Sequence, residues 1–126
     1  MMSVARCSIT LLAVVALGGA AIHGLHAQAK PSAYTIAEFE VTDPANFQTY
    51  MEKTGAGIPA AGGRVIVRAG KTYVINGEAP KRVVVIEWPS LDQAQAYFES
   101  AAYKELVSNR DKSSKFRAFV IEGVPK

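Results

Sequence analysis

The chain has 126 residues, of which 49% are hydrophobic and 20% are charged, and its formal net charge is +3. This length corresponds to one domain, and the two signs of charge are scattered along it without a basic stripe. The composition therefore favours a single small domain and argues against nucleic acid as a partner.

The first 29 residues have the pattern of a secretory signal peptide. Arg6 precedes an uncharged apolar run over residues 9–22, and Ala27-Gln28-Ala29 matches the small-residue cleavage pattern. The run is shorter than the roughly 20 residues that a membrane-spanning helix needs. We therefore expect export to the periplasm or the exterior, a mature domain of residues 30–126, and no membrane association after cleavage.

The expected mature domain lacks thiols and imidazoles. Cys7 is the only cysteine, and His23 and His26 are the only histidines, and all three precede residue 30. Disulfides, a Cys or Ser–His nucleophile, and a metal or haem held by His or Cys are thereby excluded from it. We predict no metal and no cofactor, so any chemistry must use carboxylates, Arg, Lys, Tyr, Trp, amides or the backbone.

The mature chain opens with a predicted strand and helix. Residues 33–41 alternate in a way that indicates a strand. Asp43 is a suitable N-cap and Pro44 suits the first helical position. Apolar residues follow at helical spacing, and Gly55 or Gly57 is expected to end the helix.

Two further strands are predicted in the middle of the chain. One lies within residues 62–70, after the Gly62-Gly63 turn, and residues 82–88 form the other, with three consecutive valines. Between them, Asn76-Gly77 is a strong turn signal, so residues 72–75 are predicted to form a short strand or edge extension.

A second helix and a last strand complete the order. Ser90 and Gln93 form a capping box that opens the helix, which is expected to break near Ser100 and resume to about Arg110. Residues 114–123 are predicted to form the final strand.

The order β-α-β-β-α-β is that of an α+β, ferredoxin-like sandwich. It predicts a four-stranded antiparallel sheet with two helices on one face. Valines on both faces of residues 83–86 indicate that both faces of that strand are covered, and the helices can cover only one. We therefore expect a homodimer joined sheet face to sheet face.

An ordered set of motifs runs along the chain: Asp43-Pro44, Tyr50, Gly62-Gly63-Arg64, residues 82–90, Tyr103, Arg110 and Glu122-Gly123. Together these motifs resemble the DUF1330 family, a domain of unknown function in the dimeric α/β-barrel superfamily. The resemblance covers about Tyr34 to Val124. It implies a ferredoxin-like fold and a homodimer that forms an α/β barrel, and it brings no established reaction.

Glu87 is the residue whose presence packing does not explain. Side chains alternate along a strand, so Arg82 and Glu87 point to opposite faces and cannot pair on this strand. An unpaired buried carboxylate is costly, so Glu87 needs a partner if it is buried.

Two interpretations of Glu87 stay open at this point. In the first, it lines a pocket between sheet and helices that binds a small polar or anionic molecule, and a raised pKa would make it a candidate catalytic group for proton transfer. In the second, it is a structural ion pair or a carboxylate at the rim of the sheet. The candidate ligand-binding residues are Glu87, Arg64, Tyr50, Tyr103, Arg82 and Arg110.

Three functional hypotheses follow. The domain is an exported dimeric binding protein for a small molecule, or a cofactor-independent enzyme similar to the monooxygenases and isomerases of the same superfamily, or a structural dimer module without a ligand. Fold analogy does not choose among them.

Overall fold

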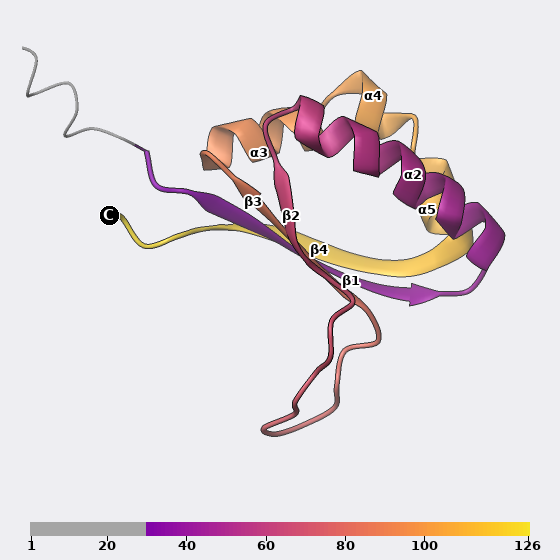
Figure 1. Cartoon of the computed structure of the whole chain (residues 1–126). Helices are drawn as coiled ribbons and strands as arrows, with labels where there is room; N and C mark the ends of the chain where they lie inside the picture. Colours follow the sequence, from indigo (N-terminus) through magenta and orange to yellow (C-terminus); the bar gives the residue numbers. More distant parts are fainter. Residues whose placement is uncertain (1–29) are drawn as a thin grey trace, which may run out of the picture.

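The fold is built on one four-stranded antiparallel sheet with the strand order β2-β3-β1-β4 (Figure 1). The structure is a computed structural model that describes residues 30–126, so the expected signal segment lies outside the described residues. Among residues 30–126, no helix combines the length and the apolar character needed to cross a membrane. The elements are β1 (Ala33–Val41), α2 (Pro44–Ala60), β2 (Arg64–Arg68), β3 (Val83–Trp88), α3 (Leu91–Phe98), α4 (Ala101–Lys104), α5 (Val107–Ser113) and β4 (Ser114–Glu122).

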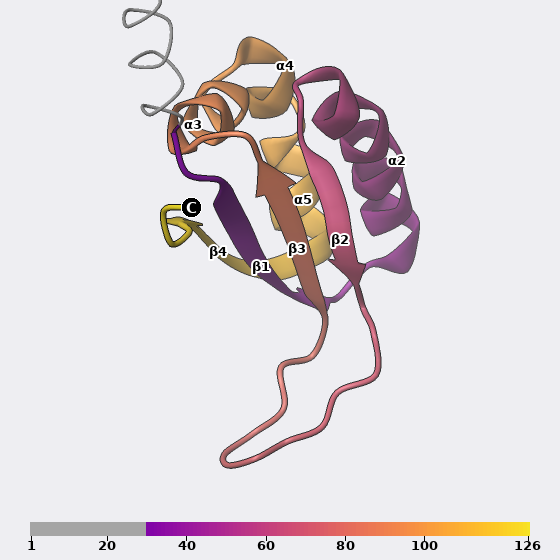
Figure 2. The same cartoon turned by 60° about the vertical axis from the view of Figure 1, so that its left-hand side comes forward.

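All helices lie on one face of the sheet, as Figures 1 and 2 show. Alternate residues of β1 and β3 point into the layer between sheet and helices, and Trp88 there is fully buried. Its indole Nε1 donates a hydrogen bond of 2.9 Å to Thr35 Oγ1 on β1, which satisfies both polar atoms within the core. The predicted α+β, ferredoxin-like fold is confirmed.

Helix α2 begins as predicted and ends later than predicted. Asp43 Oδ1 accepts a hydrogen bond from the Asn46 backbone N–H, which caps the first turn. The helix passes through both predicted stop positions to Ala60, and the chain then reverses at Gly62 with φ +94°. Gly57 instead serves packing, because a Cβ there would lie 3.1 Å from the Tyr97 hydroxyl.

The second helical segment is divided into three short helices, where one interrupted helix was predicted. Ser90 Oγ accepts from the Gln93 N–H and opens α3 as expected. Ser100 Oγ accepts from the Tyr103 N–H and opens α4, which places the break at the predicted position. A second break before Val107 separates α4 from α5.

The predicted strand over residues 72–75 is wrong. Residues 69–82 form a long irregular connection between β2 and β3, here called the β2–β3 arm. Its base is closed by a hydrogen bond of 2.9 Å from the Ala69 N–H to the Val83 carbonyl, and no strand lies beyond that point. Strand propensity fails there because no neighbouring strand offers hydrogen bonds to these residues.

The sheet face opposite the helices carries a band of apolar side chains and is here called the helix-free face. Val83 and Val85 on β3 are half-buried, whereas Phe119 and Ile121 on β4 are 46% and 54% exposed. Charged pairs border the band: Arg64 with Glu87, and Arg117 with Glu38. The described chain contains no element that covers this face (Figure 1).

Candidate functional site

A pair of buried tyrosines and one arginine meet between the sheet and the helices. Tyr50 on α2 and Tyr103 on α4 lie with their hydroxyl oxygens 3.0 Å apart. Arg110 on α5 donates from Nη1 to the Tyr103 oxygen at 3.1 Å. Three helices thus place two hydroxyls and a cation within one hydrogen-bonded chain.

Local structure explains how Tyr103 and Arg110 are oriented. The break at Ser100 turns the chain so that Tyr103 points into the core while the flanking α4 residues stay exposed. The Arg110 guanidinium donates from Nε to Asp111 Oδ1 at 2.9 Å and lies 4.3 Å from the ring centroid of Phe116. Anchored on both sides, Arg110 presents its Nη1 toward the tyrosine pair.

A small, partly open cavity of about 40 Å³ adjoins this network. Its walls are mostly aliphatic and aromatic side chains of β1, β3, α2 and α3, and Tyr50, Tyr103 and Arg68 also line it. The two threonine hydroxyls on its wall already have partners, because Thr35 accepts from Trp88 and Thr54 donates to the Tyr50 carbonyl. The cavity is therefore a mainly apolar space, and the polar side chains on its wall include the tyrosine pair and Arg68.

A larger and more open cleft of about 460 Å³ lies on the other side of Tyr103, between helices α4 and α5 and strand β4. Tyr103 and Phe116 are among the residues that line both spaces, so they form the partition between cleft and cavity. The residues that line the cleft are Thr35, Phe98, Tyr103, Lys104, Val107, Arg110, Phe116, Ala118, Phe119 and Val120.

The charged residues that line these two spaces are all basic, and the Asp111 carboxylate pairs with Arg110 just outside the lining. Lys104 and Arg110 line the cleft, Arg68 lines the cavity, and no aspartate or glutamate lines either of them. Aromatic and aliphatic side chains make up most of the remaining wall. The arrangement suits an anionic group on a mainly apolar body, which is the kind of balance that small-molecule sites show.

Tyr50 and Tyr97 hold their protons more strongly than an ordinary tyrosine, because their pKa values are raised. Burial, and next the neighbouring Tyr103, raise the pKa of Tyr50 above its ordinary 10.0. The same two causes raise the pKa of Tyr97 to about 12. At neutral pH these hydroxyls are thus hydrogen-bonding groups and not bases.

These shifts predict a loss of stability in alkali. A group whose pKa is raised on folding contributes stability that is complete below its unfolded value, here 10.0, and lost as pH rises through the folded value. The free energy of unfolding should therefore fall from about pH 10 to about pH 12. Denaturant unfolding at a series of pH values checks this, and Tyr97→Phe should flatten the slope. A slope unchanged in that variant would contradict the assignment.

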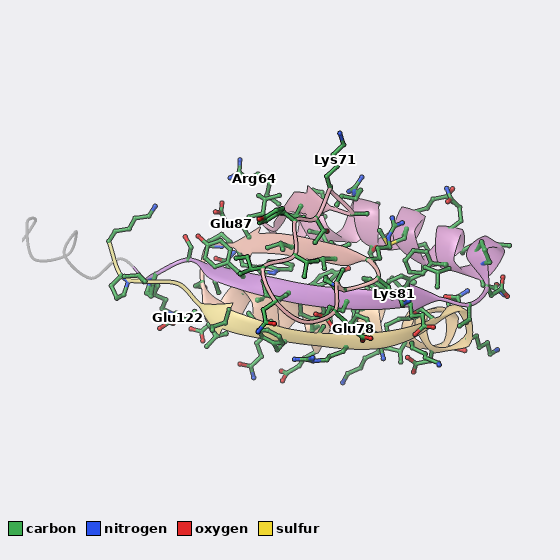
Figure 3. The ribbon with its side chains drawn as sticks, turned by 90° about the horizontal axis from the view of Figure 1, so that it is seen from below. Arg64, Lys71, Glu78, Lys81, Glu87 and Glu122 are labelled. Atoms are coloured by element: carbon green, nitrogen blue, oxygen red, sulfur yellow. The ribbon has the colours of Figure 1, made fainter. Side chains whose placement is uncertain are left out.

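Glu87 lies on the helix-free face, and the predicted pocket that joins it to Tyr50 and Tyr103 is wrong. Its Oε1 accepts from Arg64 Nη2 at 3.0 Å, and Figure 3 shows the two side chains directed toward one another beside the sheet. Strand alternation separates Glu87 from the buried Ile86 and Trp88. The geometry matches the structural interpretation, an ion pair at the rim.

Replacing Glu87 with glutamine should therefore change little. Arg64 is largely exposed and Glu87 is half-buried, and such pairs contribute about 0–1 kcal/mol. We expect the free energy of unfolding of Glu87→Gln, from urea denaturation, to lie within about 1 kcal/mol of the parent value. A loss several times larger would mean that the carboxylate has a role that this ion pair does not explain.

Arg82 also lies away from the tyrosine pair. Its guanidinium is 5.3 Å from the ring centroid of Phe47 near the start of α2, and its Nε is buried without a hydrogen-bond partner. It lines neither the cavity nor the cleft. Of the six candidate ligand-binding residues, the structure brings together Tyr50, Tyr103 and Arg110.

The sequence analysis did not place Lys104, Phe98 or Arg68 at this site. Lys104 directly follows Tyr103 in the short helix that begins after Ser100. The predicted break at Ser100 was therefore the signal that could have placed Lys104 beside Tyr103. Arg68 follows a bulge between Val65 and Val67 that shifts the register of β2, and no pattern in the sequence announces that shift. Within residues 30–126, no group of three or more His, Cys, Asp or Glu side chains is arranged to hold a metal ion.

Comparison with known proteins identifies a family and several similar folds. The family described as a domain of unknown function, DUF1330, matches residues 32–124. A search of curated proteins finds no match to this chain.

Solved structures with the same fold include a protein of unknown function from Rhodopseudomonas palustris, at 15% identity and a TM-score of 0.64, covering 86% of this chain and 95% of that one. SnoaB, a cofactor-independent oxygenase from Streptomyces nogalater, matches at 14% identity and a TM-score of 0.54, over 76% of this chain and 96% of that one. A dimeric ferredoxin-like protein of unknown function from Thermobifida fusca matches at 15% identity and a TM-score of 0.51, over 74% and 92% respectively. At such identity the likeness shows the fold alone.

Proposed function

Because this chain belongs to the DUF1330 family, a domain of unknown function, we propose its role from the geometry of the site. The domain binds a small, mainly apolar molecule that carries one anionic group. The anionic group lies at Arg110 and Lys104 in the cleft, and the apolar body lies against Phe98 and Phe116.

The observation that carries this proposal is that the charged residues lining the cleft, Lys104 and Arg110, are both basic and lie beside an aromatic wall. Arg110 already donates to Tyr103, so an anion in the cleft would meet a cation that is held in place. The cleft volume, about 460 Å³, falls within the roughly 300–1,000 Å³ of known small-molecule sites. This site replaces the pocket first expected around Glu87.

Two fluorescent probes with the same aromatic skeleton test the proposal. Anilinonaphthalene sulfonate is anionic, whereas N-phenylnaphthylamine is neutral. We expect the native protein to bind the anionic probe saturably and at least about 10-fold more tightly than the neutral one. Equal affinities, or no binding of either probe, would contradict an anion site in the cleft.

A second candidate function is that of a cofactor-independent oxygenase. Two features favour it: an apolar cavity lies directly behind the cleft, and the Streptomyces protein of the same fold is described as such an oxygenase. In that case a ligand found for the cleft would be consumed together with dioxygen, without added metal or flavin. Oxygen uptake measured with that ligand separates an enzyme from a binding protein.

We further propose that two copies of the chain associate through their helix-free faces. Phe119 and Ile121 on that face are exposed, and half-buried Val83 and Val85 continue the apolar band. Contiguous exposed apolar surface of this kind marks an interaction site. The Thermobifida protein of the same fold is described as dimeric. A monomer in light scattering at micromolar concentration would contradict the dimer.

Export remains our proposal for where the protein acts. It rests on the apolar run over residues 9–22 and the Ala27-Gln28-Ala29 pattern. Intact-mass measurement of protein recovered outside the cytoplasm should give a chain that begins at Lys30. A chain that retains its first 29 residues would contradict cleavage at this position.

A further inference from the structure

The β2–β3 arm, residues 69–82, contacts almost nothing in its own chain. Every residue from Ala69 to Lys81 is exposed. Beyond its base, the hydrogen bond from Thr72 Oγ1 to the Gly70 carbonyl at 3.4 Å is the side-chain bond found within it. Connections of this length without secondary structure are uncommon in small domains and usually have a function.

The arm carries large apolar side chains that its own chain leaves in solvent. Tyr73 is 90% exposed and Ile75 is 92% exposed, and Val74 between them is also exposed. Burying an Ile side chain is favourable by about 1.5–3 kcal/mol, and three adjacent apolar side chains left in solvent on one arm indicate a surface that binds a partner.

The direction of the arm indicates where that surface lies. The arm continues past the ends of β2 and β3 and leaves the sheet on the side away from the helices (Figures 1 and 2). Figure 3, which views the molecule from that side, shows the arm in front of the strands, with Glu78 and Lys81 near its returning half. The arm therefore projects into the space that a second copy would occupy.

We propose that each arm docks on the other copy of the chain, with Tyr73 and Ile75 buried against the partner. This inference rests on the proposed association through the helix-free face, with which the arm is continuous. Two-fold symmetry makes the contact reciprocal, so the dimer contains two equivalent arm contacts. The charged residues of the arm are Lys71, Glu78, Lys81 and Arg82, which do not form the dense basic cluster that nucleic acid or an anionic membrane selects, so a protein surface is favoured.

The test compares dimer dissociation constants, measured by dilution of fluorescently labelled protein, for the native chain and the double variant Tyr73→Ser/Ile75→Ser. We expect the variant to dissociate at concentrations at least about 100-fold higher. Val124→Ser is the matched control, because Val124 is 89% exposed but follows β4, away from the arm, and it should leave the constant unchanged.

The outcomes separate the arm from the dimer itself. A native chain that is monomeric throughout would overturn both proposals. A native dimer whose constant changes less than about 3-fold in the double variant would leave the face-to-face dimer standing and overturn the role of the arm. Vesicle binding by the native chain is a further measurement. If the native chain binds lipid vesicles and the double variant does not, while both have the same dimer dissociation constant, the proposed role of the arm is overturned in favour of a membrane contact.

Hydrogen exchange gives an independent measurement of the same contact. Amides of residues 70–81 should exchange freely in diluted protein and become protected above the dissociation constant, whereas the double variant should stay unprotected at both concentrations. Free exchange in the native dimer would also overturn the proposal.

Discussion

Truncating Trp88 to alanine should lower the free energy of unfolding by about 3–5 kcal/mol, the usual cost of removing a fully buried large aromatic. The side chain is fully buried, and its ring centroid lies 5.4 Å from that of Tyr97 and 5.9 Å from that of Phe98. Since small domains have a total stability of about 5–15 kcal/mol, this loss would remove most of the stability of a domain at the lower end of that range. Denaturant unfolding followed by circular dichroism measures the loss.

A conservative pair of variants separates volume from hydrogen bonding at this position. Trp88→Phe keeps an aromatic ring but leaves the Thr35 hydroxyl without the indole N–H at 2.9 Å. Adding Thr35→Val removes that orphaned hydroxyl, so the double variant should be more stable than Trp88→Phe alone. If adding Thr35→Val makes the Trp88→Phe variant less stable, the hydrogen bond between the Trp88 indole and the Thr35 hydroxyl does not explain the position of the indole.

Replacing Arg110 with glutamine should weaken binding of the anionic probe by about 10–100-fold, the usual effect of losing a charged hydrogen-bonding partner. Binding of the neutral probe should stay nearly unchanged, because the aromatic wall of the cleft remains. Fluorescence titration of both probes gives the two constants.

Arg117→Gln is the control that matches this change in charge. Arg117 is exposed on the helix-free face of β4, 3.9 Å from Glu38, and lines neither the cleft nor the cavity. If Arg117→Gln weakens the anionic probe as much as Arg110→Gln does, the effect comes from net charge and the cleft is not the site.

The order of elements and the faces of the strands could be predicted because both depend on local patterns. Alternation alone placed Arg82 and Glu87 on opposite faces, and the structure confirms this. The caps at Asp43 and Ser90 were equally local, since each side chain accepts from a backbone N–H three residues later.

The site was harder to predict because it depends on contacts between distant parts of the chain. Tyr50 and Tyr103 are 53 positions apart, and nothing in either segment indicates that their hydroxyls meet. The interest in Glu87 came from its position within an apolar strand, and that position is explained by Arg64 on the neighbouring strand. The register between β2 and β3 places Arg64 opposite Glu87. The sequence does not reveal this register, because β2 contains a bulge.

The arm shows how propensity can mislead. Tyr73, Val74 and Ile75 favour a strand, and Asn76-Gly77 favours a tight hairpin. A hairpin needs a surface to pack on before it is stable, and within one copy of this chain there is none.

The two edges of the sheet differ in a way that bears on aggregation. β2 ends one side with five residues and a bulge, whereas β4 ends the other with nine residues in regular register with β1. A long regular edge is a template onto which a foreign strand can add, and a short bulged one is not. Lys115 and Arg117 are both exposed along β4, so two such edges would bring like charges together. In concentrated or partly unfolded protein, fibril growth should therefore begin at β4, and salt, by screening those charges, should accelerate it.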